Sequence, residues 1–292
     1  MSALPSVAVS IMDGLYQHRL LSTLQLHALY TPAASIRWTQ RVLATLATAG
    51  LADAATVRQG LKLWYLTADG AEAVERVATR PEMRRKLTRP EQATGQLRHH
   101  TLAVNDVGIA FVKAARRRGD DCGPLSWRHE IAHPLGPPPG RRMPEQLIAD
   151  AVLTYQLNDH EGPSFHYRFI ELDRATIPVD TLADKLAKYA RLYRYTPPGS
   201  GRDESPRPAW THSYAVFPGV LVVLAGQPAE ALRRRRRTAL GLCRSDPALG
   251  ETPAVDIAIC LLEELQAHGP FAEIFHAPAH PDRPTDWLGD DA

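Results

Sequence analysis

The sequence predicts a mixed α/β (α+β) protein of two domains, a small and mostly helical N-terminal domain followed by a larger domain built on a sheet. Two observations support this prediction. Apolar residues recur at helical spacing through most of residues 6–80, interrupted by one pair of strand-like segments. After residue 99, strand-like and amphipathic helical runs follow one another, which is typical of a sheet covered by helices. The 292 residues suffice for two domains.

The composition is that of a globular protein, with 44% apolar and 23% charged residues. The sequence contains no long apolar run and its start lacks a basic segment before an apolar one, so we expect neither a transmembrane helix nor a secretory signal. The cysteines Cys122, Cys243 and Cys260 match no zinc or disulfide spacing. They favour a reducing, cytoplasmic location.

Charge is distributed unevenly along the chain. The net charge is only +2, yet residues 1–98 hold 12 Lys and Arg against 7 Asp and Glu. The remainder holds 22 and 25, and is therefore slightly acidic. A basic N-terminal part suggests a polyanionic partner for that part of the chain.

The first domain begins with two predicted helices. Residues 6–18 carry apolar side chains at helical spacing. The second helix follows directly, with Ser22 or Thr23 as its N-cap. Its buried side is predicted to consist of three leucines: Leu24, Leu26 and Leu29.

A third helix is predicted to begin after Ser35 and to end near Gly50, because serine is a good N-cap and glycine a common C-terminal stop. One side of this helix carries an apolar stripe of four residues: Ile36, Val42, Leu43 and Leu46. The opposite side would expose four residues suited to contacts with a polyanion: Arg37, Trp38, Gln40 and Arg41.

Residues 51–67 read as two short strands with a turn at Gln59-Gly60, and Thr67 can cap a fourth helix over residues 68–80. Three helices, a hairpin and a closing helix make residues 1–80 a winged helix-turn-helix, whose third helix enters the major groove. The hairpin is then the wing, with Arg58 and Lys62 near its tip.

Double-stranded DNA is therefore the predicted partner of the first domain. Arginine and glutamine are suited to base edges and phosphates, and basic wing residues contact the backbone. The predicted nucleic-acid-binding residues are Arg37, Trp38, Gln40, Arg41, Arg58 and Lys62. The alternative is a protein-interaction domain whose charges are merely solvated.

Residues 81–98 form a basic linker with two prolines, either solvated or in contact with phosphates. The second domain, residues 99–278, is predicted to contain these elements: a helix at 99–118, strands near 125–131, 147–157 and 164–173, a helix at 180–195, a buried strand in FPGVLVVLAG, and a helix with five consecutive arginines, 233–237. The acidic tail, residues 279–292, is predicted to be disordered.

Two features of the second domain have ordinary explanations. The group His99, His100, Asn105 and Asp106 is assigned to helix capping and packing between domains. The five arginines are expected to form a solvated face with ion pairs, and the alternative is a second surface that contacts phosphates.

Three acidic residues stand on neighbouring predicted strands. Glu171 and Asp173 lie two residues apart and so point the same way, which requires a metal ion, an arginine or water to compensate their charge. Asp150 lies in the preceding strand. Because adjacent strands are about 4.8 Å apart, Asp150 and Glu171 can share one Mg²⁺ ion.

The order helix, strand, strand, strand, helix, strand, with these acids, resembles the restriction-endonuclease-like fold of the PD-(D/E)xK group. The resemblance implies an α-β-β-β-α-β domain in which Asp150 and Glu171 hold Mg²⁺. If the domain is an active nuclease, its expected catalytic residues are Asp150, Glu171, Asp173 and Lys185, with Lys185 supporting the attacking water.

The sequence departs from that group where Asp173 stands in place of a lysine. Lys185 or Lys188, from the following helix, can supply the missing positive charge. Alternatively, Arg174 or Arg191 pairs with the acids in a structural ion-pair cluster. The departure favours an inactive nuclease-like domain that serves dimerisation or additional DNA contact, and it leaves enzyme activity open.

Several segments together resemble the actinobacterial replication-relaxation family. They are LSTLQLHALY, TQRVLATLATAGLA, HTLAVND at 100–106, ADAVL, ELDRAT, and a K-L-x-x-Y helix at 185–189. Members of this family are associated with plasmids, integrative elements and phages. The resemblance implies a DNA-binding protein in the replication or transfer of a mobile genetic element, or in its regulation. The alternatives are an active Mg²⁺-dependent nuclease or nickase and a winged-helix transcriptional regulator.

Overall fold

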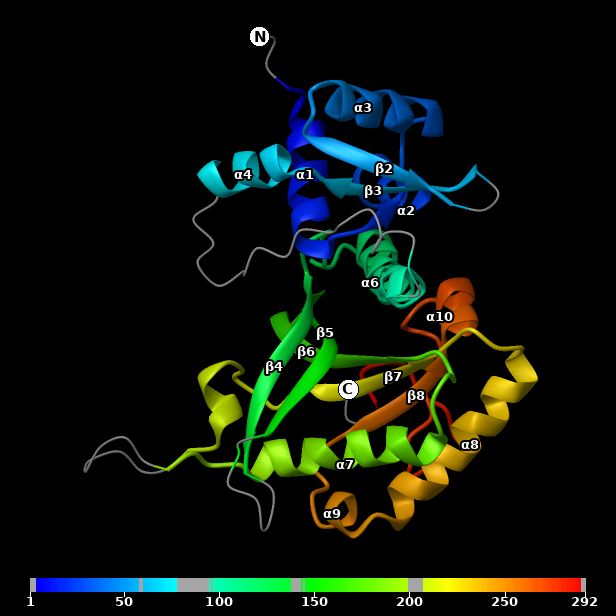
Figure 1. Ribbon diagram of the computed structural model, residues 1–292. Helices are drawn as coiled ribbons and strands as arrows, with labels where there is room; N and C mark the ends of the chain where they lie inside the picture. The colour runs from blue at the N-terminus through cyan, green and yellow to red at the C-terminus, as the bar shows by residue number, and fades with distance from the viewer. Residues whose placement is uncertain are drawn as a thin grey trace. The chain divides into compact units, whose positions relative to one another are not determined.

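The computed structural model describes residues 4–57, 60–77, 95, 97–137, 143, 145–198 and 207–289. It is a mixed structure of helices and two sheets, which confirms the predicted α+β class (Figure 1). The chain divides into two compact units. Unit 1 comprises residues 1–112 and 123–126, and unit 2 comprises residues 113–122 and 127–292.

Unit 1 contains the helices and the hairpin that the sequence predicts. Its elements are α1 (Ser6–His18), β1 (Leu21–Ser22), α2 (Thr23–Tyr30), α3 (Ile36–Thr48), β2 (Ala52–Thr56), β3 (Lys62–Leu66), α4 (Ala68–Val77) and the first part of α6 (Leu97–Arg118). The three strands form an antiparallel sheet in the order β1-β3-β2. Strand β1 is not among the predicted elements, because two residues are too short to show any periodicity.

Helix α2 is capped as predicted but buries fewer leucines. The Ser22 hydroxyl accepts a hydrogen bond from the Gln25 backbone N–H at 3.2 Å, and the Gln25 side chain accepts one from the Ser22 N–H at 3.0 Å. Leu26 and Leu29 are buried, whereas Leu24 is 63% exposed and its predicted burial is wrong. Residues two positions apart on an α-helix are rotated by about 200° around its axis, so Leu24 and Leu26 point to opposite sides.

Helix α3 ends where the sequence predicts. Gly50 has a φ of +72°, and the Leu51 N–H donates to the Leu46 carbonyl at 3.0 Å, which closes the last turn. Ser35 is the N-cap residue, although its side chain makes no capping hydrogen bond. Val42, Leu43 and Leu46 are buried, and Ile36 is only half-buried.

The first part of helix α6 belongs to unit 1, whereas the sequence analysis places the start of the second domain at residue 99. The buried Asn105 side chain donates to the Leu20 carbonyl at 2.9 Å. Gln25 donates to Asp106 at 2.7 Å and to the Leu102 carbonyl at 2.9 Å. The HTLAVND segment is therefore hydrogen-bonded to Leu20 and Gln25 of unit 1. Helical periodicity predicted the helix, but it carries no information about which elements the helix packs against.

Unit 2 is built on a five-stranded sheet with the order β4-β5-β6-β7-β8. Its other elements are the end of α6, β4 (Trp127–Gly136), β5 (Glu145–Asp159), β6 (Gly162–Asp173), α7 (Val179–Arg194), the 3-10 helix η2 (Ala209–His212), β7 (Gly219–Leu224), α8 (Ala229–Ser245), α9 (Pro247–Gly250), β8 (Ile257–Leu261) and α10 (Leu262–His268). Strands β4, β5 and β6 pair antiparallel, and β6, β7 and β8 pair parallel.

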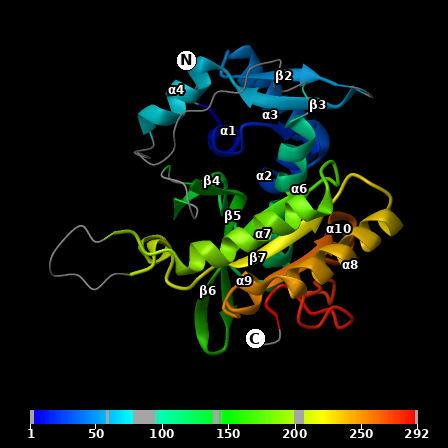
Figure 2. The ribbon, with the colours of Figure 1, turned by 60° about the horizontal axis from the view of Figure 1, so that its bottom comes forward.

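One face of this sheet is covered by two adjacent helices, α7 and α8 (Figure 2). The core between the helices and the sheet contains Phe169, Tyr189, Val222 and Leu240, all buried. Strand β7 is apolar and buried at every position, as expected for a central parallel strand. Strands β5 and β6, which carry Asp150, Glu171 and Asp173, lie inside this sheet and not at its edges.

The C-terminal segment packs against the sheet, which corrects the predicted disorder for residues 279–289. Trp287 is 1% exposed, and its ring lies 5.0 Å from that of Tyr155, centroid to centroid. The Arg168 guanidinium lies 4.9 Å from the centroid of the same indole. The acidic composition predicted disorder, but the burial of one large aromatic side chain outweighs it. Residues 290–292 lie outside the described part.

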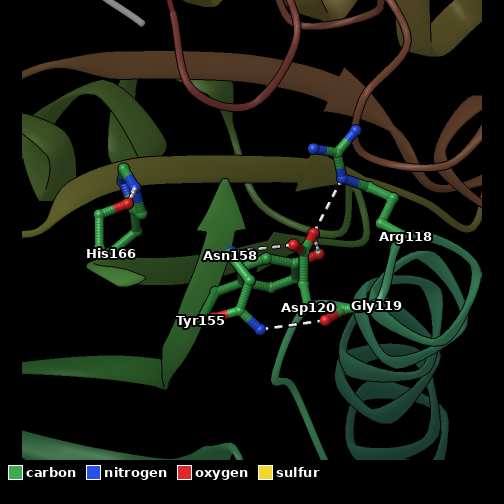
Figure 3. A network of polar contacts seen from close by, with 7 residues as sticks. Arg118, Gly119, Asp120, Tyr155, Asn158 and His166 are labelled. Carbon is green, nitrogen blue, oxygen red and sulfur yellow. Dashed lines mark hydrogen bonds and ion pairs between the residues drawn. The ribbon is translucent and has the colours of Figure 1, made fainter. Parts of the chain in front are cut away.

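A polar network joins the end of α6 to β5 (Figure 3). The Asp120 carboxylate accepts hydrogen bonds from the Tyr155 hydroxyl at 2.6 Å, the Asn158 N–H at 3.0 Å and Arg118 at 2.8 Å. The Asn158 side chain donates to the Gly119 carbonyl at 3.0 Å. Burial raises the pKa of Asp120, but the three donors outweigh it, so the net pKa is lowered.

Two buried histidines generate a prediction about acid stability. Burial lowers the pKa of His18, which donates to the Pro124 carbonyl at 2.7 Å, to about 4, and it lowers the pKa of His133 to about 4. The unfolded chain then binds more protons than the folded chain between those values and the unfolded value of about 6.5. Stability should therefore fall as the pH falls through this window.

We expect His18→Gln, whose amide can still donate to the Pro124 carbonyl, to make this decline shallower by up to about 3 kcal/mol. Urea denaturation of wild type and variant across the window measures it. Parallel stability curves for the two proteins would contradict the assignment.

Candidate functional site

Helix α3 presents a polar and basic face to solvent. Arg37, Gln40 and Arg41 are exposed, and Trp38 is half-buried. The predicted face therefore lies at the surface of unit 1, while the opposite side of the helix packs into the unit. Helical spacing places the half-buried Trp38 at one edge of the face formed by Arg37, Gln40 and Arg41.

A buried hydroxyl network fixes α3 against α2. The Thr39 hydroxyl, fully buried on α3, lies 2.6 Å from the Thr31 hydroxyl and 2.9 Å from Nδ1 of His27. His27 Nδ1 also lies 3.0 Å from the Thr31 hydroxyl. Because all three groups are partners of one another, the angle between the two helices is constrained, and with it the orientation of the basic face.

The β2–β3 hairpin lies in the same unit. Lys62 is exposed at the start of β3, and Gly60 has a φ of +75°, which suits the predicted turn. The Trp64 indole donates to the Thr23 hydroxyl at 3.0 Å, tying the hairpin to α2. Arg58 and residues 81–94 of the predicted linker lie outside the described residues.

In unit 2 the structure brings together three of the four predicted catalytic residues. Lys185 of α7 forms an ion pair with Glu171 of β6, and its Nζ lies 3.6 Å from Oδ1 of Asp150 on β5. The Tyr189 hydroxyl, also on α7, donates to the second oxygen of Glu171. We call Asp150, Glu171, Lys185 and Tyr189 the acid–lysine cluster.

Strand register and helix spacing place these side chains. The β5–β6 backbone pairing ends at Ala151–Ile170. Beyond this pair, the Asp150 carboxylate accepts a hydrogen bond from the Leu172 N–H at 2.8 Å, in place of a backbone carbonyl of the neighbouring strand. Lys185 and Tyr189 are four residues apart and so lie on one side of α7. The end of the β5–β6 pairing and one turn of α7 therefore bring Asp150, Lys185 and Tyr189 close to Glu171.

The cluster is buried and unevenly charged. Glu171 is 2% exposed, and burial, followed by the nearby Asp150 charge, raises its pKa to about 8. Burial lowers the pKa of Lys185, but the two carboxylates more than offset this, so its pKa is raised. Two carboxylates and one ammonium would leave one negative charge, so the cluster favours holding an additional proton near neutral pH.

Asp173, the fourth predicted catalytic residue, takes different partners. It forms an ion pair with Arg235 of α8 and accepts the Ala175 N–H at 2.9 Å. The predicted partners Arg174 and Arg191 do not fill this role: Arg191 pairs with Glu145 at 2.8 Å. The sequence signal for Arg235 was the arginine run, which did not indicate which of its members points inward.

The donor chemistry of the cluster matches Mg²⁺ only in part. Asp150 and Glu171 offer two carboxylates, and Mg²⁺ is commonly held by one or two together with water and phosphate oxygens. Within the described ranges, no group of three or more His, Cys, Asp or Glu side chains is arranged to hold a metal ion. Lys185 already lies beside both carboxylates, so a cation would compete with its ammonium group.

These features define a mixed α/β protein with an exposed basic helix in one unit and a buried acid–lysine cluster in the other. The chain matches the replication-relaxation family over residues 12–202 and belongs to that family. The family description indicates a role in replication or relaxation. Comparison with curated proteins and with solved structures found no significant match. None of the described helices is both long and apolar enough to cross a bilayer.

Removing the Lys185 charge should destabilise unit 2 in a pH-dependent way. In Lys185→Met, Glu171 can avoid an unpaired buried charge only by staying protonated, so the loss of stability should reach about 1–3 kcal/mol in mildly alkaline buffer and shrink in mild acid. Urea denaturation at both pH values measures it.

Lys188→Met is the matched control for that variant. Lys188 pairs with the more exposed Glu145 at 2.7 Å, and we expect its removal to cost less than about 1 kcal/mol at either pH. Equal destabilisation of the two variants would show that Lys185 does not compensate the buried charge.

Proposed function

We propose that this chain is a double-stranded DNA-binding protein that acts in replication or relaxation of a plasmid or another mobile element. Unit 1 is then a winged helix-turn-helix, with α3 as the recognition helix and the β2–β3 hairpin as the wing. The observation that carries the proposal is the outward-facing, basic side of α3, formed by Arg37, Gln40 and Arg41.

The placement of these residues supports major-groove binding. In helix-turn-helix proteins the N-terminal residues of the recognition helix contact base edges. Arg37, Gln40 and Arg41 all lie in the first half of α3, and arginine and glutamine can each form two hydrogen bonds with one base. The Thr39 network gives the helix the fixed orientation that such readout requires.

The proposal gives unit 2 a nuclease-like fold with a closed acidic site. The position of Lys185 supports this part of the proposal, because Lys185 pairs with Glu171 and lies near Asp150. Its ammonium group therefore already compensates part of the negative charge that a metal ion would neutralise. The acid–lysine cluster then stabilises the sheet, and unit 2 serves as a structural or additional DNA-binding part.

A second candidate function is a Mg²⁺-dependent DNA nuclease. The observation that favours it is that a lysine from α7 reaches both carboxylates, as the resemblance to the PD-(D/E)xK group implies. Asp150 and Glu171 would then hold Mg²⁺, which supplies charge neutralisation at a scissile phosphate. Lys185 would orient the attacking water, with Tyr189 holding Glu171 in place.

The first prediction for this function concerns DNA affinity. Arg37→Ala with Arg41→Ala should lower affinity for duplex DNA at least about tenfold, and should reduce the slope of log K against log salt by about 0.9 for each phosphate that the protein no longer neutralises. Gel-shift or anisotropy titration of genomic fragments over a range of salt measures both quantities.

The control for that pair is Arg76→Ala, because Arg76 is an exposed arginine on α4 of the same unit and pairs with its helix neighbour Glu72. We expect it to leave affinity nearly unchanged. Wild-type binding that is absent, or that does not respond to salt, would remove the proposal.

The second prediction separates the two candidate functions. Supercoiled plasmid incubated with the protein and Mg²⁺ should stay intact if Lys185 closes the site. Nicking that disappears in Glu171→Gln but persists in Glu145→Gln would establish the nuclease instead. Glu145 is the matched control because it lies on β5 and pairs with Lys188 and Arg191, outside the acid–lysine cluster.

A further inference from the structure

Helix α8 carries a concentration of positive charge that the proposed function of α3 does not use. Residues 229–245 contain six arginines and one acidic residue, Glu230. This helix lies beyond residues 12–202, the segment that matches the family. The charge therefore belongs to a part of this chain that the family match does not cover.

Two of the six arginines serve the interior of unit 2. The Arg235 and Arg236 side chains are only 13% and 11% exposed. Arg235 forms an ion pair with Asp173, and Arg236 forms one with Glu264 at 3.2 Å. These ion pairs tie α8 to β6 and to α10. They account for two of the six arginines of α8, and the other four lie outside the interior of unit 2.

The remaining four arginines lie at the surface: Arg233, Arg234, Arg237 and Arg244. Arg233 forms an ion pair with Glu264 at 3.4 Å, and Arg237 forms one with Glu230 at 3.8 Å. Both arginine side chains are exposed, so each ion pair contributes little to stability. Among the described residues, Arg234 and Arg244 form no ion pair. The surface of α8 thus carries a largely uncompensated positive charge.

Helical geometry aligns these four side chains. A turn of about 100° per residue places them within an arc of about 100°, along about 16 Å of the helix axis. We call this row the α8 arginine stripe. Arginines in such a row match a regularly spaced line of anions better than a single anionic ligand does.

Gly241 lies in the middle of the stripe. A Cβ atom added there would meet nothing within 4 Å, so no packing contact requires a glycine. Glycine inside a helix costs about 1 kcal/mol relative to alanine. Its effect at this point is to leave bare backbone between Arg237 and Arg244, where a ligand can approach closely.

We propose that the α8 arginine stripe binds the phosphate backbone of double-stranded DNA, independently of sequence. Guanidinium groups pair with phosphate oxygens through two parallel hydrogen bonds. A membrane surface is disfavoured, because the apolar side chains of α8, such as Leu232, Leu240 and Cys243, are buried, and interfacial helices need an exposed apolar face. The stripe rests on the proposed function and is a second contact, additional to α3.

The test uses the full chain and two charge-matched double variants. Arg234→Gln with Arg244→Gln removes the two stripe arginines that form no ion pair. Arg76→Gln with Arg194→Gln removes two exposed arginines from α4 and α7. The probe is a short duplex of mixed sequence, titrated by fluorescence anisotropy at several salt concentrations.

We expect the stripe variant to bind about tenfold more weakly and its salt slope to fall by about 0.9 for each phosphate that it no longer neutralises, while the control keeps both values. The same weakening should appear in the Arg37→Ala, Arg41→Ala background, which separates the stripe from α3. A stripe variant that behaves like the control overturns the inference and leaves the proposed role of α3 standing.

Gly241 provides an independent variant. Gly241→Ala should raise the stability of the protein and keep affinity within about twofold, whereas Gly241→Gln should also fold but weaken binding by obstructing the approach of the backbone. Equal affinity in the two variants counts against the stripe. Vesicles of phosphatidylglycerol and phosphatidylcholine serve as the competing surface, and stripe-dependent vesicle binding without stripe-dependent duplex binding overturns the proposal.

Discussion

The compensation of two buried carboxylates on β6 is the constraint on which the architecture of unit 2 depends. Glu171 and Asp173 are both almost fully buried at the end of this central strand. An uncompensated charge in such a place costs several kcal/mol. Lys185 from α7 pairs with the first and Arg235 from α8 with the second. The two helices that cover one face of the sheet are therefore positioned by ion pairs as well as by apolar packing.

The same constraint determines what the acid–lysine cluster can do. A site whose carboxylates already face an ammonium group resists metal entry, because a metal ion must replace an existing interaction. The raised pKa of Glu171 adds a proton as a further competitor near neutral pH. Stability and catalysis thus depend on the same side chains, and the proposed DNA-binding role, which rests on α3 and α8, does not require the cluster to open.

Much of the organisation could be predicted, because it depends on local chemistry. The Ser22 cap, the Gly50 stop and the exposed side of α3 follow from residue type and helical period. The meeting of Asp150, Glu171 and Lys185 was predicted from strand order and a resemblance, not from periodicity. The predicted burial of Leu24 and the predicted disorder of residues 279–289 were wrong. The exposure of Leu24 follows from helical spacing alone, whereas the packing of residues 279–289 depends on contacts with residues distant in the chain.

By itself the sequence determined most of the order of helices and strands, the basic face of α3 and the acidic residues of β5 and β6, since these depend on residues close together along the chain. Only the tertiary structure decided which charges compensate one another. In the structure, Arg235 and not Arg174 or Arg191 is the ion-pair partner of Asp173. Two arginines of α8 point into unit 2, and four lie at its surface. The reason is that one arginine resembles the next in sequence, and only packing on the sheet gives each a different environment.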